Sequence, residues 1–397
     1  MASVDPKAVL EGRIPGRPPA GLIVGLIASS ACALIALGLD AVFGGRGFGV
    51  GLLLALLPVP LLVAIVLFLD RLEPEPARNL VLAFMWGAGV AVLGALVLNT
   101  LGMIYVTVPV FGEAKGNFIS ATLGAPLVEE SLKGTVLFGL LWFRRDEIDG
   151  FIDGLVYAAL VAIGFAMMEN VTYYMRAYDQ GGSAQLQGVF IARGILSPLG
   201  HPLFTSMTGL GVAYAATHRG VGRILAPIVG LLAAMVLHGL WNGASAFGLT
   251  GLALVYLLDF CILLILIIVI IVDRRRTVQL INRYLPLYYE TGLVTPQDVW
   301  MLGRMPARRA ARHWARSVGG RPAARAMADF QLAATELALL HRRAERGTID
   351  PARFQRRQDA LLELMRLARQ AFLRTPPQPV LPPWAGRHPS GFYQPRP

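Results

Sequence analysis

The chain has 397 residues, of which 55% are hydrophobic and only 15% carry a charge. Soluble domains carry about 25% charged residues, so this composition argues against an ordinary soluble protein and indicates a polytopic membrane protein. The formal net charge is +11, but from Asp273 onward the chain holds 22 Arg against 9 acidic residues. The basic character therefore belongs to the C-terminal third of the chain.

Residues 1–19 form a short basic segment ahead of the first apolar run. Lys7, Arg13 and Arg17 precede an apolar stretch that is longer than the core of a cleaved signal peptide. This pattern predicts an uncleaved signal anchor whose N-terminus stays in the cytoplasm.

Apolar runs long enough to cross a bilayer recur through residues 20–272. About 20 helical residues cross the hydrocarbon core, and the runs that reach this length are 20–43, 48–69, 79–102, 119–143, 151–175, 196–217, 224–246 and 250–272. The predicted fold is therefore all-α, a polytopic membrane helix bundle of about eight transmembrane helices.

Basic residues are unevenly shared between the loops of this predicted bundle. With the N-terminus inside, the inner loops carry Arg71, Arg78, Arg144, Arg145, Arg219, Arg223 and Arg274–Arg276. The outer loops carry only Arg46, Lys115, Arg176 and Arg193. Because Lys and Arg are enriched in cytoplasmic loops, we expect a multi-pass protein of the cell membrane with both termini in the cytoplasm.

The region after the last span, residues 273–374, is expected to be a basic helical cytoplasmic domain. Two helix starts are marked by an N-cap residue followed by proline, at Thr295 and at Asp350. Apolar residues recur at helical spacing after each start, which predicts a helical hairpin that turns near Gly347. Residues 375–397 are rich in proline, and we expect them to be disordered.

An Arg-rich region of this kind has a polyanion as its natural partner. The tail lacks regular aromatic interleaving and any recognised nucleic-acid-binding motif, which argues against nucleic acid. A basic face lying on the anionic inner leaflet of the lipid bilayer is the simpler interpretation.

Polar groups inside membrane helices are costly and are therefore functional candidates. Most of them belong to one set on the fourth to seventh segments: Glu129, Glu130 and Lys133; Glu169 and Asn170, with Phe165 and Tyr173 one turn away; His201; and His238 and Asn242. Glu129 and Lys133 share a helix face, whereas Glu130 is rotated by about 100°. One acid can thus pair with the lysine while the other stays free to act.

These polar groups are predicted to lie at a similar depth in the membrane. At about 1.5 Å per helical residue, Glu129, Glu169 and His238 lie about 10–15 Å below the outer boundary. His201 lies within about 10 Å of that boundary. Four helices therefore bring polar groups into the outer half of the membrane, which indicates one shared site.

Amide hydrolysis is the chemistry that fits this set of groups. A carboxylate can accept a proton from water, and imidazole and amide groups can stabilise the oxyanion that forms on a scissile carbonyl. The sequence contains no H-E-x-x-H and no G-x-S-x-G, so two common hydrolase patterns are excluded.

Four short motifs follow one another on these segments: E-E-x-x-K at Glu129–Lys133, F-x-x-x-E-N at Phe165–Asn170, the histidine of GHPLFTSMTG, and H-G-L-W-N at His238–Asn242. In this order they resemble the PrsW family of glutamic-type intramembrane proteases, which is related to the CAAX-prenyl endopeptidase and bacteriocin-processing superfamily. The resemblance covers about residues 75–272 and does not extend to the tail.

The resemblance implies cleavage of a membrane-anchored protein, within or just outside the membrane; known family substrates include anti-sigma factors. The family's functional residues map onto Glu129, Glu130, Glu169, His201, His238 and Asn242. In the wider superfamily the second motif ends in histidine, so Glu169 follows the PrsW branch. No cofactor or metal ion is expected.

Our mechanistic hypothesis is that Glu129 or Glu130 activates a water held with the help of His201, while His238 and Asn242 stabilise the oxyanion. One alternative is a metal-dependent membrane protease, because imidazoles and carboxylates also bind divalent ions. Another is an ion- or proton-coupled transporter, although the chain shows no inverted repeat. A third is an inactive scaffold that recruits a partner through its tail.

Overall fold

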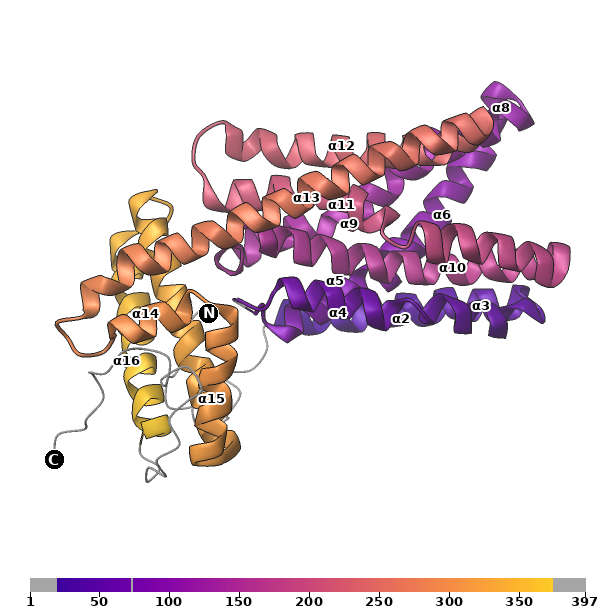
Figure 1. Cartoon of the computed structure of the whole chain (residues 1–397). Coiled ribbons are helices and arrows are strands. Elements are labelled where there is room, and N and C mark those ends of the chain that lie inside the picture. The colour runs from indigo at the N-terminus through magenta and orange to yellow at the C-terminus, as the bar shows by residue number, and fades with distance from the viewer. Residues whose placement is uncertain (1–19, 73, 374–397) are drawn as a thin grey trace. The chain divides into compact units, whose positions relative to one another are not determined.

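The computed structural model describes residues 20–72 and 74–373, and these residues form helices with no strand among them (Figure 1). This confirms the predicted all-α membrane bundle. The chain divides into two compact units, and the boundary between them falls within one helix, between Asp273 and Arg274. The expected N-terminal segment 1–19 and the Pro-rich end 375–397 lie outside the described residues.

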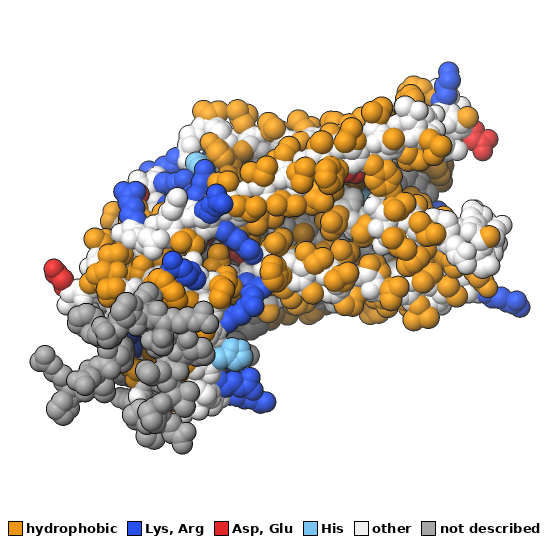
Figure 2. Space-filling model, in the orientation of Figure 1, with side chains coloured by type: hydrophobic (Ala, Val, Ile, Leu, Met, Phe, Trp, Pro, Cys, Tyr) orange, Lys and Arg blue, Asp and Glu red, His pale blue; other side chains and the backbone are white. Residues whose placement is uncertain are grey.

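The membrane unit consists of long helices joined by short helical turns. The long helices are α2 (Ala20–Phe43), α3 (Gly47–Leu56), α4 (Val59–Leu69), α5 (Ala77–Trp86), α6 (Val92–Gly102), α9 (Ala125–Phe143), α10 (Phe151–Phe190), α11 (Gly200–Thr217), α12 (Gly222–Ala244) and α13 (Gly248–Tyr284). The shorter elements are η1 (Gly87–Ala91), η2 (Met103–Thr107), α7 (Val108–Phe111), α8 (Glu113–Ile119), η3 (Ser120–Gly124), η4 (Arg145–Glu147), η5 (Ile191–Leu196) and η6 (Ser245–Phe247). Hydrophobic side chains cover most of the membrane unit in the face that Figure 2 shows.

Six helical stretches of the described chain are long and apolar enough to cross a membrane. They are Ala20–Phe43, Gly47–Leu69, Ala77–Phe111, Phe151–Thr217, Gly222–Ala244 and Gly248–Tyr288. The stretch Phe151–Thr217 contains both the fifth and the sixth predicted segments, and α9 is not among the six because it carries three charged residues. The number of eight spans stays a prediction.

Helix α10 packs closely against α5 and α11 because glycines line the contacts. A Cβ atom added to Gly154 would lie 2.3 Å from the carbonyl oxygen of Gly209 on α11, and one added to Gly164 would lie 2.1 Å from that of Phe84 on α5. Small residues allow such backbone-to-backbone packing between membrane helices. This packing fixes the position of the residues that α10 presents further along its length.

The chain reverses within α10. Gly181 and Gly182 have non-helical backbone angles, and φ of Gly182 is +64°. Arg193 on η5 reaches back to Glu169 over a sequence separation of 24 residues, which would be about 36 Å in a continuous helix. The returning segment therefore lies beside the part of α10 that precedes the two glycines.

The second unit is helical and has its own core. Its elements after α13 are η7 (Leu285–Tyr288), α14 (Pro296–Leu302), α15 (Met305–Glu345) and α16 (Pro351–Leu373). Both predicted caps are confirmed, because Thr295 accepts a hydrogen bond from the backbone N–H of Asp298 and Asp350 accepts one from that of Arg353. The predicted turn is confirmed at Gly347, whose φ is +61°.

Candidate active site

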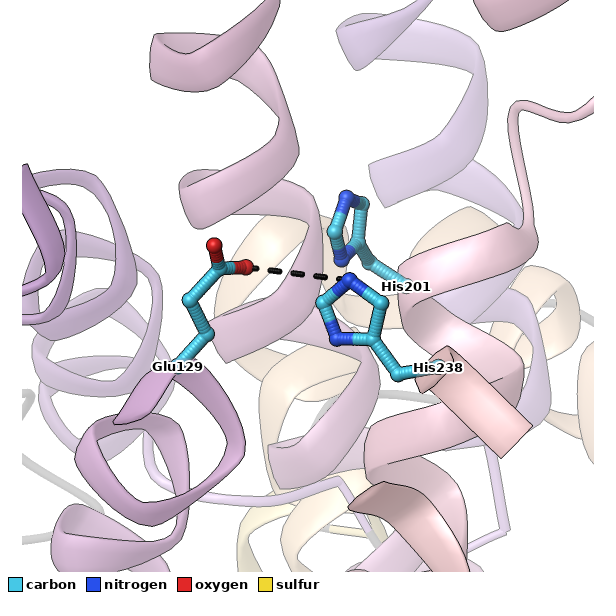
Figure 3. A group of neighbouring side chains, drawn as sticks. All are labelled: Glu129, His201 and His238. Atoms are coloured by element: carbon cyan, nitrogen blue, oxygen red, sulfur yellow. Dashed lines mark ion pairs between the residues drawn. The ribbon is translucent and has the colours of Figure 1, made fainter. Parts of the chain in front are cut away.

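The structure brings the predicted acids and histidines together from four helices. Glu129, Glu130 and Lys133 lie on α9, Glu169 lies on α10, His201 begins α11, and His238 lies near the end of α12. Figure 3 shows Glu129, His201 and His238 turned toward one another. Helix α9 buries its three charged side chains among the neighbouring helices and not toward the bilayer.

Glu130 is fully buried and has both carboxylate oxygens engaged. Its Oε1 accepts hydrogen bonds from Nζ of Lys133 at 2.8 Å and from Nδ1 of His238 at 3.1 Å. Its Oε2 accepts one from the hydroxyl of Thr205 at 2.8 Å. The expected pairing of Lys133 with Glu129 is the looser one, at 3.8 Å, so the lysine primarily holds Glu130.

Glu129 has one oxygen that is held and one that is not. Its Oε1 accepts a hydrogen bond from Nδ2 of Asn99 on α6 at 3.2 Å. Its Oε2 has no hydrogen-bond partner in the described part of the chain. That oxygen lies 3.8 Å from Nε2 of His238 and 3.8 Å from Nζ of Lys133, and the side chain is only 7% exposed.

His238 connects the two acids of α9. Its Nδ1–H donates to Glu130, which leaves Nε2 directed toward Glu129. The ring stacks on Phe204, with centroids 5.3 Å apart, and meets the ring of His201 edge to face at 5.0 Å. These contacts fix both the orientation of the imidazole and the nitrogen that faces the free carboxylate oxygen.

Glu169 holds His201 from the other side. Its Oε2 accepts a hydrogen bond from Nε2 of His201 at 2.9 Å and pairs with the guanidinium of Arg193. Nζ of Lys133 lies 3.0 Å from Nδ1 of His201. Phe165 lies below these groups, with its ring 4.0 Å from Nζ of Lys133 and 5.4 Å from the His201 ring.

Three further predicted residues contact the site's surroundings. Nδ2 of Asn242 donates to the carbonyl oxygen of Ala121 in η3 at 2.9 Å, so this amide ties α12 to η3. Asn170 accepts a hydrogen bond from Arg193 at 2.7 Å. Tyr173 is 46% exposed, and its ring lies 3.9 Å from the Arg193 guanidinium.

A small cavity adjoins this cluster on the side of His201. Its volume is about 30 Å³, which is room for one or two water molecules. Its lining includes Asn170, Arg193, Ser197, His201, Phe204 and Trp241. Water can therefore be held within the protein beside the histidine.

The site also has the donor set of a catalytic metal ion. One ligand atom from each of Glu129, His201 and His238 lies within 4.8 Å of the other two. A carboxylate and two imidazoles with an open position is a known catalytic zinc arrangement, and the Glu130–His238 bond is of the kind that orients a metal-binding histidine. The ammonium of Lys133 disfavours a second cation at this point, but the donor chemistry fits.

Two side chains that bind the acids were missed by sequence reasoning, and a third had no assigned role. Thr205 bonds Glu130 and Asn99 bonds Glu129, while Arg193 pairs with Glu169. Thr205 follows His201 by four residues, so it shares the histidine's helix face, and this spacing is a signal for it. Asn99 is a polar residue in the apolar third segment, which is a signal of the same kind as for the acids.

Known proteins resemble the membrane unit. Residues 75–272 match the family model described as "PrsW family intramembrane metalloprotease". The protein named Protease PrsW of Oceanobacillus iheyensis is 28% identical over 162 residues, which are 40% of this chain and 71% of that protein. Protease PrsW of Bacillus subtilis is 24% identical over 215 residues, which are 54% of this chain and 89% of that protein.

A third relative, Protease PrsW of Clostridioides difficile, is 29% identical over 157 residues, covering 40% of this chain and 62% of that protein. No solved structure was found to match the chain. The matched region contains all four motifs and every acid and histidine of the cluster described above. This chain therefore belongs to the PrsW family of intramembrane proteases.

Proposed function

We propose that this protease hydrolyses peptide bonds of membrane-anchored proteins and that Glu129 activates the attacking water. The observation that carries the proposal is Oε2 of Glu129, a buried oxygen with no hydrogen-bond partner among the described residues. It lies 3.8 Å from Nε2 of His238 and 3.8 Å from Nζ of Lys133. A water molecule that lies about 2.8 Å from Oε2 and about 2.8 Å from one of these two nitrogens would bridge them.

Glu130 has a supporting part in this proposal. A general base needs an oxygen that faces the water whose proton it takes. Both oxygens of Glu130 already accept hydrogen bonds, from Lys133, His238 and Thr205. Glu130 therefore orients His238 and holds the lysine, and Glu129 is left to act on water.

The Glu129 carboxylate and the His238 imidazole, which face each other, carry out the proton transfers of catalysis. Glu129 accepts a proton from the water as the water oxygen bonds to the scissile carbonyl carbon. The same carboxyl returns the proton to the amine nitrogen as the C–N bond breaks. With Nδ1–H bonded to Glu130, a second proton on Nε2 allows His238 to donate to the carbonyl oxygen as its negative charge develops.

The balance of charges in the cluster supports this second proton on His238. The carboxylates of Glu129, Glu130 and Glu169 face the cations of Lys133 and Arg193. One negative charge is left over, and an unbalanced buried charge is costly. A proton held between Glu129 and His238 makes the set neutral.

A metal-dependent version of the hydrolysis is the second candidate, because the matched family model names metalloproteases. Glu129, His201 and His238 would hold the ion, and Glu130 would orient His238 through its Nδ1–H. A bound divalent ion supplies Lewis acidity toward a carbonyl oxygen and makes its bound water more acidic.

Two substitutions and a metal measurement test the proposal. Full-length protein is reconstituted in liposomes with a single-pass reporter substrate, and Glu129→Gln and Glu130→Gln are compared with the wild type. Glu129→Gln should lower kcat by about 10²–10⁴-fold, the usual contribution of a general base. Wild-type activity in both variants would refute the site. Stoichiometric bound metal, with cleavage that chelators abolish, would establish the second candidate.

The substrate and the cellular setting are part of the same proposal. We expect a protein of the cell membrane with cytoplasmic termini, since basic residues are concentrated in the loops assigned to the inside. Its substrates are then single-pass proteins of the anti-sigma-factor type, cut in the outer half of the membrane. Membrane-protein fragments present with the wild type but absent from the Glu129→Gln/Glu130→Gln double variant would identify them.

A further inference from the structure

Arg193 is a charged residue that none of the four motifs includes. It lies on the π-helical segment η5, just before α11 begins with His201. Its guanidinium pairs with Glu169, its Nε donates to Oδ1 of Asn170 at 2.7 Å, and its plane covers the ring of Tyr173 at 3.9 Å. Three partners thus hold this side chain in one position.

Arg193 is the first member of a continuous chain of contacts. Glu169 binds Nε2 of His201 at 2.9 Å, and Nδ1 of the same ring lies 3.0 Å from Nζ of Lys133. Lys133 binds Glu130 at 2.8 Å, and Glu130 binds Nδ1 of His238 at 3.1 Å. The chain therefore ends at the imidazole that faces the free oxygen of Glu129.

Glu169 and Lys133 lie at the two ring nitrogens of His201. An ammonium can only donate, so Nδ1 of His201 must accept from Lys133 and its proton must lie on Nε2. An ionised Glu169 accepts that Nε2–H. A Glu169 carboxylate that turned away from Nε2 would leave the ring free to rotate away from Lys133, so the position of this carboxylate sets the position of the ring.

We propose that Arg193 is a positioning residue of the proteolytic site: by holding the Glu169 carboxylate against Nε2 of His201, it fixes the imidazole ring that lies against Lys133 and so keeps Lys133 on Glu130. The inference rests on the proposed function, because it assigns Arg193 to the support of the Glu129–His238 pair. Because Arg193 orients catalytic groups and does not bind the substrate, its replacement is expected to lower kcat and to leave KM unchanged.

Three variants of the full-length protein distinguish a positioning role of Arg193 from a purely structural role. Arg193→Gln leaves Glu169 without its cation, and we expect kcat to fall by about 10- to 100-fold, as for other residues that orient a catalytic group. Arg193→Lys restores the charge without the planar fork and should recover part of the loss. The double variant Glu169→Gln/Arg193→Gln removes both charges, and its amide oxygen can still accept the Nε2–H of His201.

The double variant is the decisive measurement. If Arg193 acts through the charge of Glu169, the double variant has a higher kcat than Arg193→Gln alone. Equal kcat values in the two variants, or a loss confined to KM, would overturn the inference. Arg176→Gln is the matched control, because Arg176 is an exposed arginine of α10 whose charge acts on Tyr173 and Asp40, and among the described residues it has no hydrogen bond or ion pair with the acids and histidines of the cluster.

The inference and the proposed function can fail separately. Cleavage that depends on Glu129 but is unchanged in Arg193→Gln would remove only the inference. Cleavage that is unchanged in Glu129→Gln would remove the proposed function. Thermal unfolding of each variant shows whether a loss of kcat accompanies loss of the fold, and unchanged unfolding of Arg193→Gln together with the lower kcat is the expected result.

Discussion

A single hydroxyl completes the hydrogen bonding of the buried Glu130 carboxylate. The hydroxyl of Thr205 donates to Oε2 of Glu130 at 2.8 Å, and both residues are fully buried. Thr205→Val preserves the shape of the side chain but removes this donor. An unpaired buried polar group costs about 1–3 kcal/mol, and more when it is charged, so we expect a fall in stability of at least that size, measured by thermal unfolding in detergent.

Thr135→Val is the control for this substitution. Thr135 is an exposed residue of α9 whose hydroxyl donates to the backbone oxygen of Ser131 in its own helix. Its loss leaves no buried charge without a donor and should leave the unfolding temperature close to that of the wild type. Equal effects of the two substitutions would show that Thr205 is not a specific partner of Glu130.

At the residue scale the sequence could predict which polar groups meet, but not how they pair. The four-residue spacing favours a pair between Glu129 and Lys133, yet Nζ of Lys133 lies closer to Glu130. Thr205 and His238, from two other helices, position the Glu130 carboxylate beside the lysine. The free acid is therefore decided by tertiary contacts that helix spacing does not contain.

At the element scale, the contact between α10 and α11 depends on two facing glycines. A Cβ atom on Gly154 would meet the backbone oxygen of Gly209 at 2.3 Å, so Gly154→Ala must move the helices apart. The two helices carry Glu169 and His201, and a shift of about 1 Å at a reacting centre can cost about 10²-fold in rate. We expect cleavage of the reporter substrate to fall by about this factor.

Gly188→Ala is the control, in the returning part of α10 beyond the reversal at Gly181 and Gly182. A Cβ atom on Gly188 meets nothing within 4 Å, and alanine favours a helix over glycine by about 1 kcal/mol. This substitution should leave cleavage unchanged and should not lower the unfolding temperature. A similar loss of activity in both variants would show that glycine packing does not set the geometry of the site.

The extent of the helices was harder to predict than their existence. Hydropathy placed the fifth and sixth spans at 151–175 and 196–217 and treated the residues between them as a loop. In the structure these residues are helical, in α10 and η5, with the reversal confined to Gly181 and Gly182. A hydropathy window detects long apolar segments and therefore misses a polar helix. Arg193 lies on the returning segment that hydropathy missed.

A histidine joins three elements of the tail unit. Nε2 of His341 on α15 lies 2.7 Å from the hydroxyl oxygen of Tyr288 on η7, and Nε2 of Gln358 on α16 donates to the same hydroxyl at 2.7 Å. The His341 ring stacks on Tyr284, with centroids 5.0 Å apart. Burial lowers the pKa of His341 from its usual 6.5, while the neighbouring Glu345 acts in the opposite direction.

This lowered pKa predicts a loss of tail stability on acidification. The unfolded tail takes up a proton near pH 6.5, whereas the folded tail does so only at lower pH. The contribution of His341 is therefore present above pH 6.5 and lost as the pH falls below it. Hydrogen exchange of tail peptides, corrected for its intrinsic pH dependence, should become faster relative to the unfolded rate.

His341→Gln isolates this effect, because glutamine can still bond the Tyr288 hydroxyl but does not titrate. Asp329 contributes in the opposite sense: burial raises its pKa to about 6, so its contribution is lost as the pH rises through that value. The difference between wild type and His341→Gln should therefore be present at neutral pH and shrink in acid. A constant difference at all pH values would contradict the prediction.

At the scale of the whole molecule, the chain divides its chemistry between two units. The unit that ends at Asp273 contains the polar cluster within apolar helices, whereas the unit that begins at Arg274 contains the excess of arginine. Composition alone could predict this division. The sequence could not predict which arginines remain on the surface, because burial depends on how the tail helices pack.

The first half of α15 presents an unbalanced basic face. Residues 305–328 contain six Arg and no Asp or Glu. Arg309, Arg312 and Arg316 follow at spacings of three and four and so share one helix face, beside the buried Ala311 and Ala315. Burial and the neighbouring Arg309 lower the pKa of Arg312, so an anion bound at this face would stabilise its charged form.

We predict that this basic face binds anionic phospholipid headgroups, because the tail follows directly from a membrane helix and each basic residue near such a surface contributes about 1 kcal/mol. Full-length protein in nanodiscs should show slower hydrogen exchange over residues 305–318 with anionic than with neutral lipid. The triple variant Arg309→Gln/Arg312→Gln/Arg316→Gln should abolish that difference, as should high salt. The matched variant Arg353→Gln/Arg356→Gln/Arg366→Gln, on α16, should retain it. If hydrogen exchange over residues 305–318 is equally fast with anionic and neutral lipid, or is slowed by added nucleic acid instead, anionic lipid is not the partner.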